Sequence, residues 1–132
     1  MRHPITNGLK DMTMSGNTTA TTGEVPLGDA ISATDAVSGV LVVRVDNRSI
    51  ASGASFKVVC RGVSLSPLNP SFPYPMTTDL ADSGALTNVG GVAVQLTTPI
   101  PDHLQVFFVF AHGTNTGTST IRIDVELELR TA

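Results

Sequence analysis

The chain has 132 residues, only 14% of them charged, and a formal net charge of −3. This length suits one domain with a single core. The few Lys and Arg residues are spread from Arg2 to Arg130, so the sequence lacks the clustered cations of a nucleic-acid groove, and no apolar run reaches the length of about 18 residues that a membrane span needs. A surface with so few charges suits a subunit packed among others, and a neutral secreted β domain is the alternative.

The residue types favour strands. β-branched Val, Ile and Thr are abundant and suit a pleated surface, while the straight-chain helix formers Lys, Glu and Gln are scarce. Cys60 is the single cysteine, so an internal disulfide is impossible, and its neighbours Val58 and Val59 predict a buried thiol rather than a nucleophile. The first residues lack the apolar segment of a signal peptide, so we expect the protein to be made and folded in a cytoplasm.

The N-terminal residues differ from the rest of the chain. Between Thr13 and Glu24, the types Thr, Ser, Gly and Asn predominate, and such a segment cannot build a core of its own. We therefore divide the chain into a polar N-terminal arm, 1–24, and a β-sandwich domain, 25–132. The arm has two placements at even odds, along its own domain or across a neighbouring subunit. The apolar side chains of the arm that we expect to contact a partner are Ile5, Leu9, Met12 and Met14.

Two strand patterns open the central part of the domain. Val40–Val45 is a nearly continuous apolar run, typical of a strand covered on both faces. Phe56 and Cys60 share one face of the following strand, but beyond Gly62 the apolar positions shift to odd numbers, beginning with Val63. This change of parity predicts a β-bulge or bend near Gly62.

A proline-rich segment follows. Four prolines lie within residues 66–75, and because proline lacks the N–H that a ladder needs, this stretch is predicted to be a loop or an extended edge segment. Phe72 and Tyr74 within it are candidate anchors against the core or against a partner.

The last three strand patterns are the clearest. After Gly90, an alternating run places Val92 and Val94 on one face. Residues 104–111 contain three of the five phenylalanines and are mostly apolar on both faces, which predicts a central strand covered on both sides. Residues 121–130 alternate strictly between apolar and charged side chains, so this strand needs one buried and one wet face. The turn-forming residues between the last two strands predict a hairpin of 104–111 with 119–130.

These patterns define the expected architecture. About seven or eight short strands, without a helix-length segment to connect parallel neighbours, predict an all-β fold. We expect an antiparallel β-sandwich or jelly roll with an extended N-terminal arm.

Histidine and cysteine do not form the pattern of a reactive site. His3, His103 and His112 lack the close spacing that places two imidazoles on one metal, and Cys60 stands apart from them. The sequence also contains no serine-nucleophile motif and no phosphate-binding glycine loop. We expect no enzymatic activity and assign no catalytic, cofactor-binding or metal-binding residue.

Three acids on the last strand are the one further candidate. Asp124, Glu126 and Glu128 share a face and could bind a hard cation. Arg122 and Arg130 flank them on the same face, and further charges are expected on the adjacent strand. We therefore predict a salt-bridged exposed sheet face, whose charges also discourage unwanted strand pairing.

Over its whole length the chain resembles the small β-sandwich accessory subunits of tailed-phage virions, such as head decoration (cement) proteins. The resemblance consists of the polar arm 1–24 followed by a sandwich that ends in IRIDVELELR, and it assigns a role to no single residue. It implies a non-enzymatic virion protein, without cofactor, made in the host cytoplasm and present in many copies. The implied partners are other copies of the chain and a major capsid or other virion protein, with no direct contact to nucleic acid or membrane.

Two alternatives fit the same patterns. The first is a β-sandwich module that recognises a glycan or a protein through the loops 66–76 and 112–118. The second is a subunit of a bacterial surface or spore fibre built by strand exchange through the arm.

Overall fold

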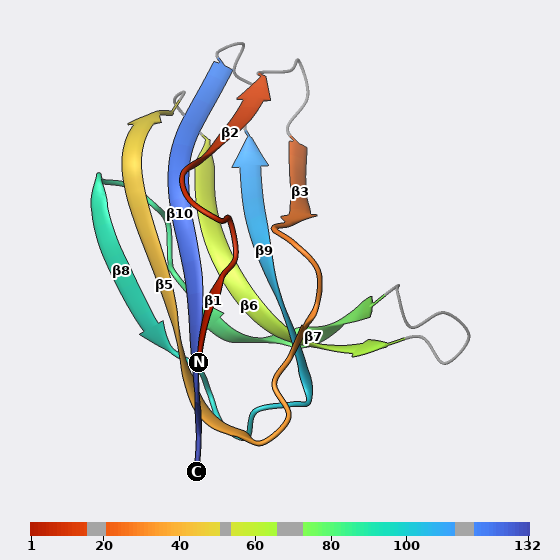
Figure 1. The fold of residues 1–132 in the computed structure, drawn as a ribbon. Coiled ribbons are helices and arrows are strands. Elements are labelled where there is room, and N and C mark those ends of the chain that lie inside the picture. Colours follow the sequence, from red (N-terminus) through yellow and green to blue (C-terminus); the bar gives the residue numbers. More distant parts are fainter. Residues whose placement is uncertain (16–20, 51–53, 66–72, 113–117) are drawn as a thin grey trace.

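The computed structural model describes residues 1–15, 21–50, 54–65, 73–112 and 118–132. They form ten strands in two five-stranded sheets that pack face to face (Figure 1). Every strand pair is antiparallel. The antiparallel β-sandwich expected from the sequence is confirmed.

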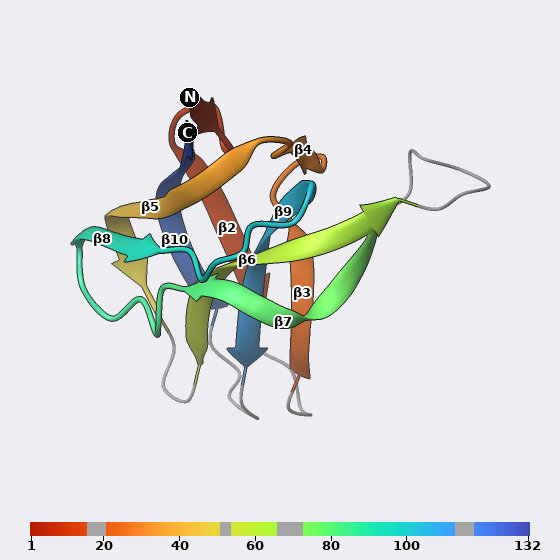
Figure 2. The same ribbon diagram turned by 90° about the horizontal axis from the view of Figure 1, so that it is seen from below.

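The first sheet has the order β1-β10-β5-β8, with β2 also paired to β10. Its strands are β1 (Arg2–Pro4), β2 (Lys10–Ser15), β5 (Ala36–Ser49), β8 (Gly90–Gln95) and β10 (Thr118–Thr131). The two 14-residue strands β5 and β10 form the centre of this sheet, and the two ends of the chain lie close together at one end of the sandwich (Figures 1 and 2).

The second sheet has the order β3-β9-β6-β7, with β4 also paired to β9. Its strands are β3 (Thr21–Pro26), β4 (Ile31–Ser32), β6 (Ser55–Leu65), β7 (Pro73–Asp82) and β9 (His103–His112). The strand count exceeds the expected seven or eight because the first 32 residues contribute four short strands, β1 to β4. Of these, β3 crosses the expected boundary between residues 24 and 25.

The core lies between the sheets and consists of alternate side chains from their facing surfaces. On β10, the five apolar positions of the final strand are all buried, and Ile123, Val125 and Leu127 have no exposed surface. From the second sheet, the rings of Phe56 and Phe108 meet at a centroid distance of 5.1 Å. In the last strand, the apolar residues of the alternating pattern are therefore the ones that face the core.

Three of the sequence predictions concern single strands of these sheets. The β6–β7 pairing shifts register on both sides of Arg61, close to the irregularity expected near Gly62. The extra residues lie on β7, however, and β6 pairs with β9 without a shift through Gly62. The central position of β9 is also confirmed, since it lies between β3 and β6, but only residues 104–108 are buried on both faces and residues 109–111 are half-buried. On β5, however, only one face is buried. Val40 and Val42 are half-buried on the other face, because no element of the described chain covers that side of the sheet.

The predicted hairpin of the last two strands is wrong. β9 belongs to the second sheet and β10 to the first, so the chain crosses from one sheet to the other between His112 and Thr118. Two strands that each have an apolar face can pair side by side in one sheet, or they can lie in different sheets and face each other across the core. The sequences of β9 and β10 are compatible with both arrangements. Only the partners available on each side, β6 for one and β5 for the other, decide between these arrangements.

The far ends of β6 and β7 extend beyond the body of the sandwich. The pairing of β6 with β9 ends at Gly62, which lies opposite Leu104. Beyond this point β6 pairs with β7 alone, from Val63 to Leu65. Both views show this two-stranded ribbon projecting past β9 and β3 (Figures 1 and 2).

Candidate functional site

The N-terminal segment forms a broken edge strand along β10. β1 pairs with residues 126–128 of β10, and β2 pairs with residues 118–123. Between β1 and β2 the backbone turns through Asn7 and Gly8, both at positive φ, which a non-glycine residue other than Asn rarely adopts. The Ile5 N–H still donates to the Val125 carbonyl at 2.9 Å, so the break is local. In the single chain, the arm thus follows the first of its two expected placements, along its own domain.

The four apolar residues expected to contact a partner from this arm have different surroundings. Ile5, Met12 and Met14 are partly buried and pack against the core cluster. Leu9 is 56% exposed and leaves most of its side chain uncovered. The arm is therefore attached mainly by its backbone ladder and by three half-covered side chains.

The two remaining anchor candidates fall at the limit of the described residues. Phe72 lies outside them. Tyr74 pairs through its backbone with Ser64 on the projecting ribbon, while its side chain lies outside the described part of the chain. The loops 66–76 and 112–118 likewise fall mostly outside it.

A network of charges covers the outer face of the first sheet. The Glu126 carboxylate accepts hydrogen bonds from Arg2 on β1 at 2.5 Å and from Arg44 on β5 at 3.1 Å. The bond from Arg2 is the largest cause that lowers the pKa of Glu126 below its usual value, although burial opposes the shift. Arg44 also lies 3.6 Å from Asp124. Asp124 and Glu126 are thus neutralised by cations from neighbouring strands, as predicted, whereas Glu128 lies 4.0 Å from Arg130 of β10 itself.

The same pairing extends along the arm. Arg122 donates to Asp11 of β2 at 2.9 Å, and this hydrogen bond is the largest cause that raises the pKa of Arg122. No group of three or more His, Cys, Asp or Glu side chains that could hold a metal ion occurs among the described residues. On this face, Asp11, Asp124 and Glu126 form ion pairs with arginines and are not arranged around a common cation site.

A second charge cluster lies on the outer face of the second sheet. Arg61 of β6 forms a bidentate ion pair with Glu24 at 2.6 and 2.7 Å and donates to Asp79 at 2.5 Å. Its guanidinium also stacks over Phe107, 5.2 Å from the ring centroid. The hydrogen bond from Arg61 lowers the pKa of Glu24. Next to this cluster lies a small apolar group of Val59, Val63 and Phe107. Arg61 packs over the Phe107 ring and so helps to shield this group from solvent.

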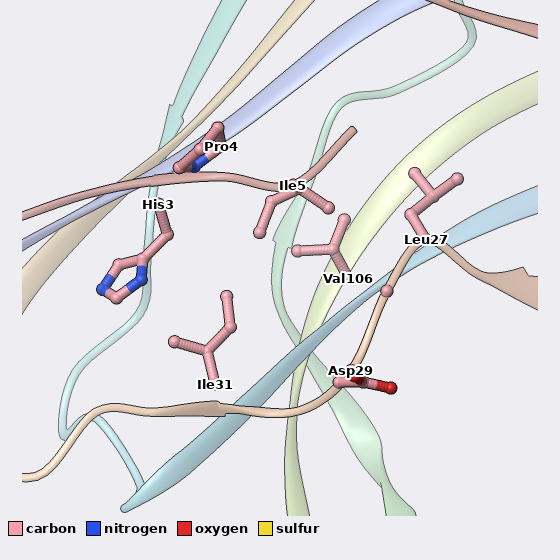
Figure 3. Close-up of a pocket in the computed structure, with 8 residues that line it drawn as sticks. His3, Pro4, Ile5, Leu27, Asp29, Ile31 and Val106 are labelled. Carbon is pink, nitrogen blue, oxygen red and sulfur yellow. The ribbon is translucent and has the colours of Figure 1, made fainter. Parts of the chain in front are cut away.

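A small cavity lies between the arm and the second sheet (Figure 3). Its volume is about 170 Å³, below the range of about 300–1,000 Å³ that is usual for ligand pockets. Ile5, Ile31 and Val106 point into it, whereas the Asp29 carboxylate points away (Figure 3). His3 also lines the cavity. The cavity therefore has the character of a packing gap between two sheet edges.

Cys60 is buried and unreactive in this fold. Burial is the main cause that raises the pKa of its thiol to about 12, and the nearby charge of Asp79 acts in the same direction. A thiol with such a pKa is almost entirely protonated near neutral pH and is a poor nucleophile. The sequence interpretation of Cys60 as a buried side chain is confirmed.

Comparisons with known proteins add little. No protein-family model and no curated protein matches the chain. A solved structure described as IMPa from Pseudomonas aeruginosa in complex with an O-glycopeptide is similar over 96% of this chain, with 15% sequence identity and a TM-score of 0.44, and the match spans 13% of that chain. A similarity of this size indicates neither family nor function. Among the residues that the structure describes, no helix is long and apolar enough to cross a membrane.

Proposed function

We propose that the protein is a non-enzymatic structural subunit that acts by packing against copies of itself and against other proteins of a larger assembly. In its specific form, the proposal is an accessory subunit of a virion, of the head decoration or cement kind. The virion is then its location, and a major capsid protein or another virion protein is its partner.

The projecting β6–β7 ribbon carries the proposal. A two-stranded ribbon without further neighbours is at best marginally stable in water. From Val63 to Leu65, β6 has no strand partner but β7 within the described chain. Contact with another protein would add neighbours to this ribbon, and an assembly subunit provides such contact in its working state.

The N-terminal edge strand supports the same proposal. A segment held by a backbone ladder and half-covered side chains can form the same ladder with β10 of an identical neighbour. Exchange of this kind would link subunits without any new interaction chemistry. The strand-exchanged surface or spore fibre remains the second form of the proposal, because it uses the same segment.

The charged faces also favour packing over chemistry. Glu126, Arg61 and Arg122 are each engaged by opposite charges from other strands of their own sheet. Surfaces that are compensated in this way can approach another protein without leaving a charge unpaired.

Copy number on purified particles tests the proposal. The chain should be quantified by mass spectrometry in particles purified from cells that produce it, relative to the most abundant shell protein. A stoichiometric ratio is expected for a lattice subunit. Trace amounts on particles, together with saturable binding of the isolated full chain to glycans on an array, would instead establish the glycan-binding module.

A further inference from the structure

One edge of the first sheet is open. β8 lies at the end of the strand order and pairs with β5 alone, and Figure 1 shows it at the outer side of the sheet. The opposite edge of this sheet is occupied by β1 and β2. An open edge presents a row of backbone donors and acceptors to any strand that can approach it.

β8 lacks the residues that usually protect such an edge. Its sequence, GGVAVQ, contains neither proline nor charge. Apart from the two-residue β4, the other described edge strands, β1, β2, β3 and β7, each carry proline or charged side chains, for example Pro4, Lys10, Glu24 and Asp79. Because proline and charge are the common means of preventing edge-to-edge pairing, β8 is the described long edge that is compatible with it.

The alternation of the β5–β8 ladder identifies the groups that face outward. The Leu96 N–H donates to the Gly39 carbonyl at 2.9 Å, and the register places Val94 opposite Leu41 and Val92 opposite Val43. In an antiparallel pair, every second residue directs its N–H and C=O toward the partner strand. The residues between them direct these groups away from β5, and they are Gly91, Ala93 and Gln95.

An apolar side chain next to this edge is incompletely covered. Val92 and its partner Val43 both face the core side of the sheet, but Val92 is 36% exposed whereas Val43 is 1% exposed. Val89, the residue immediately before β8, is 61% exposed. The second sheet thus stops short of β8 and leaves an apolar strip along the open edge.

We propose that β8 is a docking edge for β8 of a second copy of this chain, paired antiparallel about a twofold axis at Ala93. In this register the outward groups of Gly91 and Gln95 meet those of Gln95 and Gly91 in the second copy, and Ala93 meets its own equivalent. All three outward residues then form hydrogen-bonded pairs. Two five-stranded sheets become one continuous sheet.

The side chains favour this occupant. Val92 of each copy lies beside Val94 of the other on the core side, so the exposed strip is covered from both directions. On the outer face, Arg44 lies next to Gly91 in the register, and the position across the seam is the uncharged Gln95. Self-pairing therefore brings no like charges opposite each other, as an isologous contact requires.

This pairing rests on the proposed assembly function and gives it a specific contact. One six-residue strand per copy is a small interface, so association should depend on protein concentration. Sedimentation equilibrium of the full chain tests it. Ala93→Lys places two ammonium groups opposite each other at the axis and should raise the dissociation constant of the dimer by up to about fivefold, which corresponds to roughly 1 kcal/mol, because like charges directly opposite each other are destabilising. The matched control Ala93→Gln adds length without charge and should change it little.

Oxidative crosslinking tests the register of the proposed β8–β8 pairing. Ala93→Cys should form a disulfide with itself, because hydrogen-bonded antiparallel pairs have Cα atoms about 5.5 Å apart, within the range that a disulfide spans. Native Cys60 is buried and should not contribute. The control variant Thr13→Cys places an exposed thiol on the opposite edge, on β2, and should remain uncrosslinked.

The outcomes separate the two proposals. A dimer that forms crosslinks at Thr13→Cys but not at Ala93→Cys, and that tolerates Ala93→Lys, overturns the β8 pairing while assembly through another edge stands. A chain that stays monomeric at all concentrations also overturns the β8 pairing, and the particle copy number then decides the proposed function by itself. Stoichiometric copies on particles would retain that function, and trace amounts would end it.

Discussion

β10 and β8 flank the same strand, β5, but they differ in what holds them. β10 has a partner on each side, and its five inward side chains are at most 4% exposed. β8 has a partner on one side only, and the inward-facing Val92 is 36% exposed. The comparison separates a strand that determines stability from a strand whose surface is available for contact.

The largest expected effect is on the inner face of β10. Leu127→Ala removes a fully buried side chain from the middle of the core and should lower the free energy of unfolding by about 2–5 kcal/mol. Urea denaturation followed by far-UV circular dichroism measures this loss, since the chain has no tryptophan to report by fluorescence. A loss below about 1 kcal/mol would show that β10 is not the stability-determining strand.

The outer face of β10 should respond less, and with a dependence on pH. Glu126→Gln keeps the shape of the side chain but removes the charge that Arg2 and Arg44 neutralise, so the variant should be less stable near neutral pH. The folded-state pKa of Glu126 is lowered, so its contribution is present above the ordinary carboxyl value of 4.5 and is lost as the pH falls through the folded-state pKa. The wild type and the variant should therefore differ in stability near neutral pH and converge in acid.

A matched control for this variant lies two residues further along the strand. Glu128→Gln changes the same chemical group on a side chain that is 50% exposed and reaches Arg130 at only 4.0 Å. Its effect near neutral pH should be smaller than that of Glu126→Gln, because exposed ion pairs contribute little. Equal effects of the two variants would contradict a special role of the Arg2–Glu126–Arg44 contact.

The sequence predicts the faces of strands better than their neighbours. The alternation of residues 121–130 and the mostly apolar run 104–108 are properties of single strands, and both patterns agree with the observed burial. Pairing depends on contacts far apart in sequence, and no local pattern distinguishes a hairpin of β9 with β10 from two strands in opposite sheets. The change of parity near Gly62 has another cause than the expected bulge in β6. This strand pairs with β9 without a shift through Gly62, and Val63 packs with Val59 in the second apolar cluster.

The arm illustrates the same limit at the candidate site. Its composition correctly indicates a segment without a core of its own, but short strands such as β1 depend on the neighbour to which they bond, here β10. Arg2 and Glu126 are 124 residues apart, and neither carries a local signal of their ion pair. The acid row on β10 indicated that cations were needed nearby, and only the sheet order identifies Arg2 and Arg44 as their source.

The smallest expected effect completes the comparison at β8. Val92→Ala removes two methyl groups from a side chain that is only partly covered, so in the dilute monomer it should lower the free energy of unfolding by less than about 1 kcal/mol. If β8 pairs between copies, however, the same variant should weaken the dimer, because Val92 is covered there. Urea denaturation at low concentration and sedimentation at high concentration measure the two effects on one protein. A variant with a large loss of monomer stability and unchanged association would place Val92 in the core rather than at a contact surface.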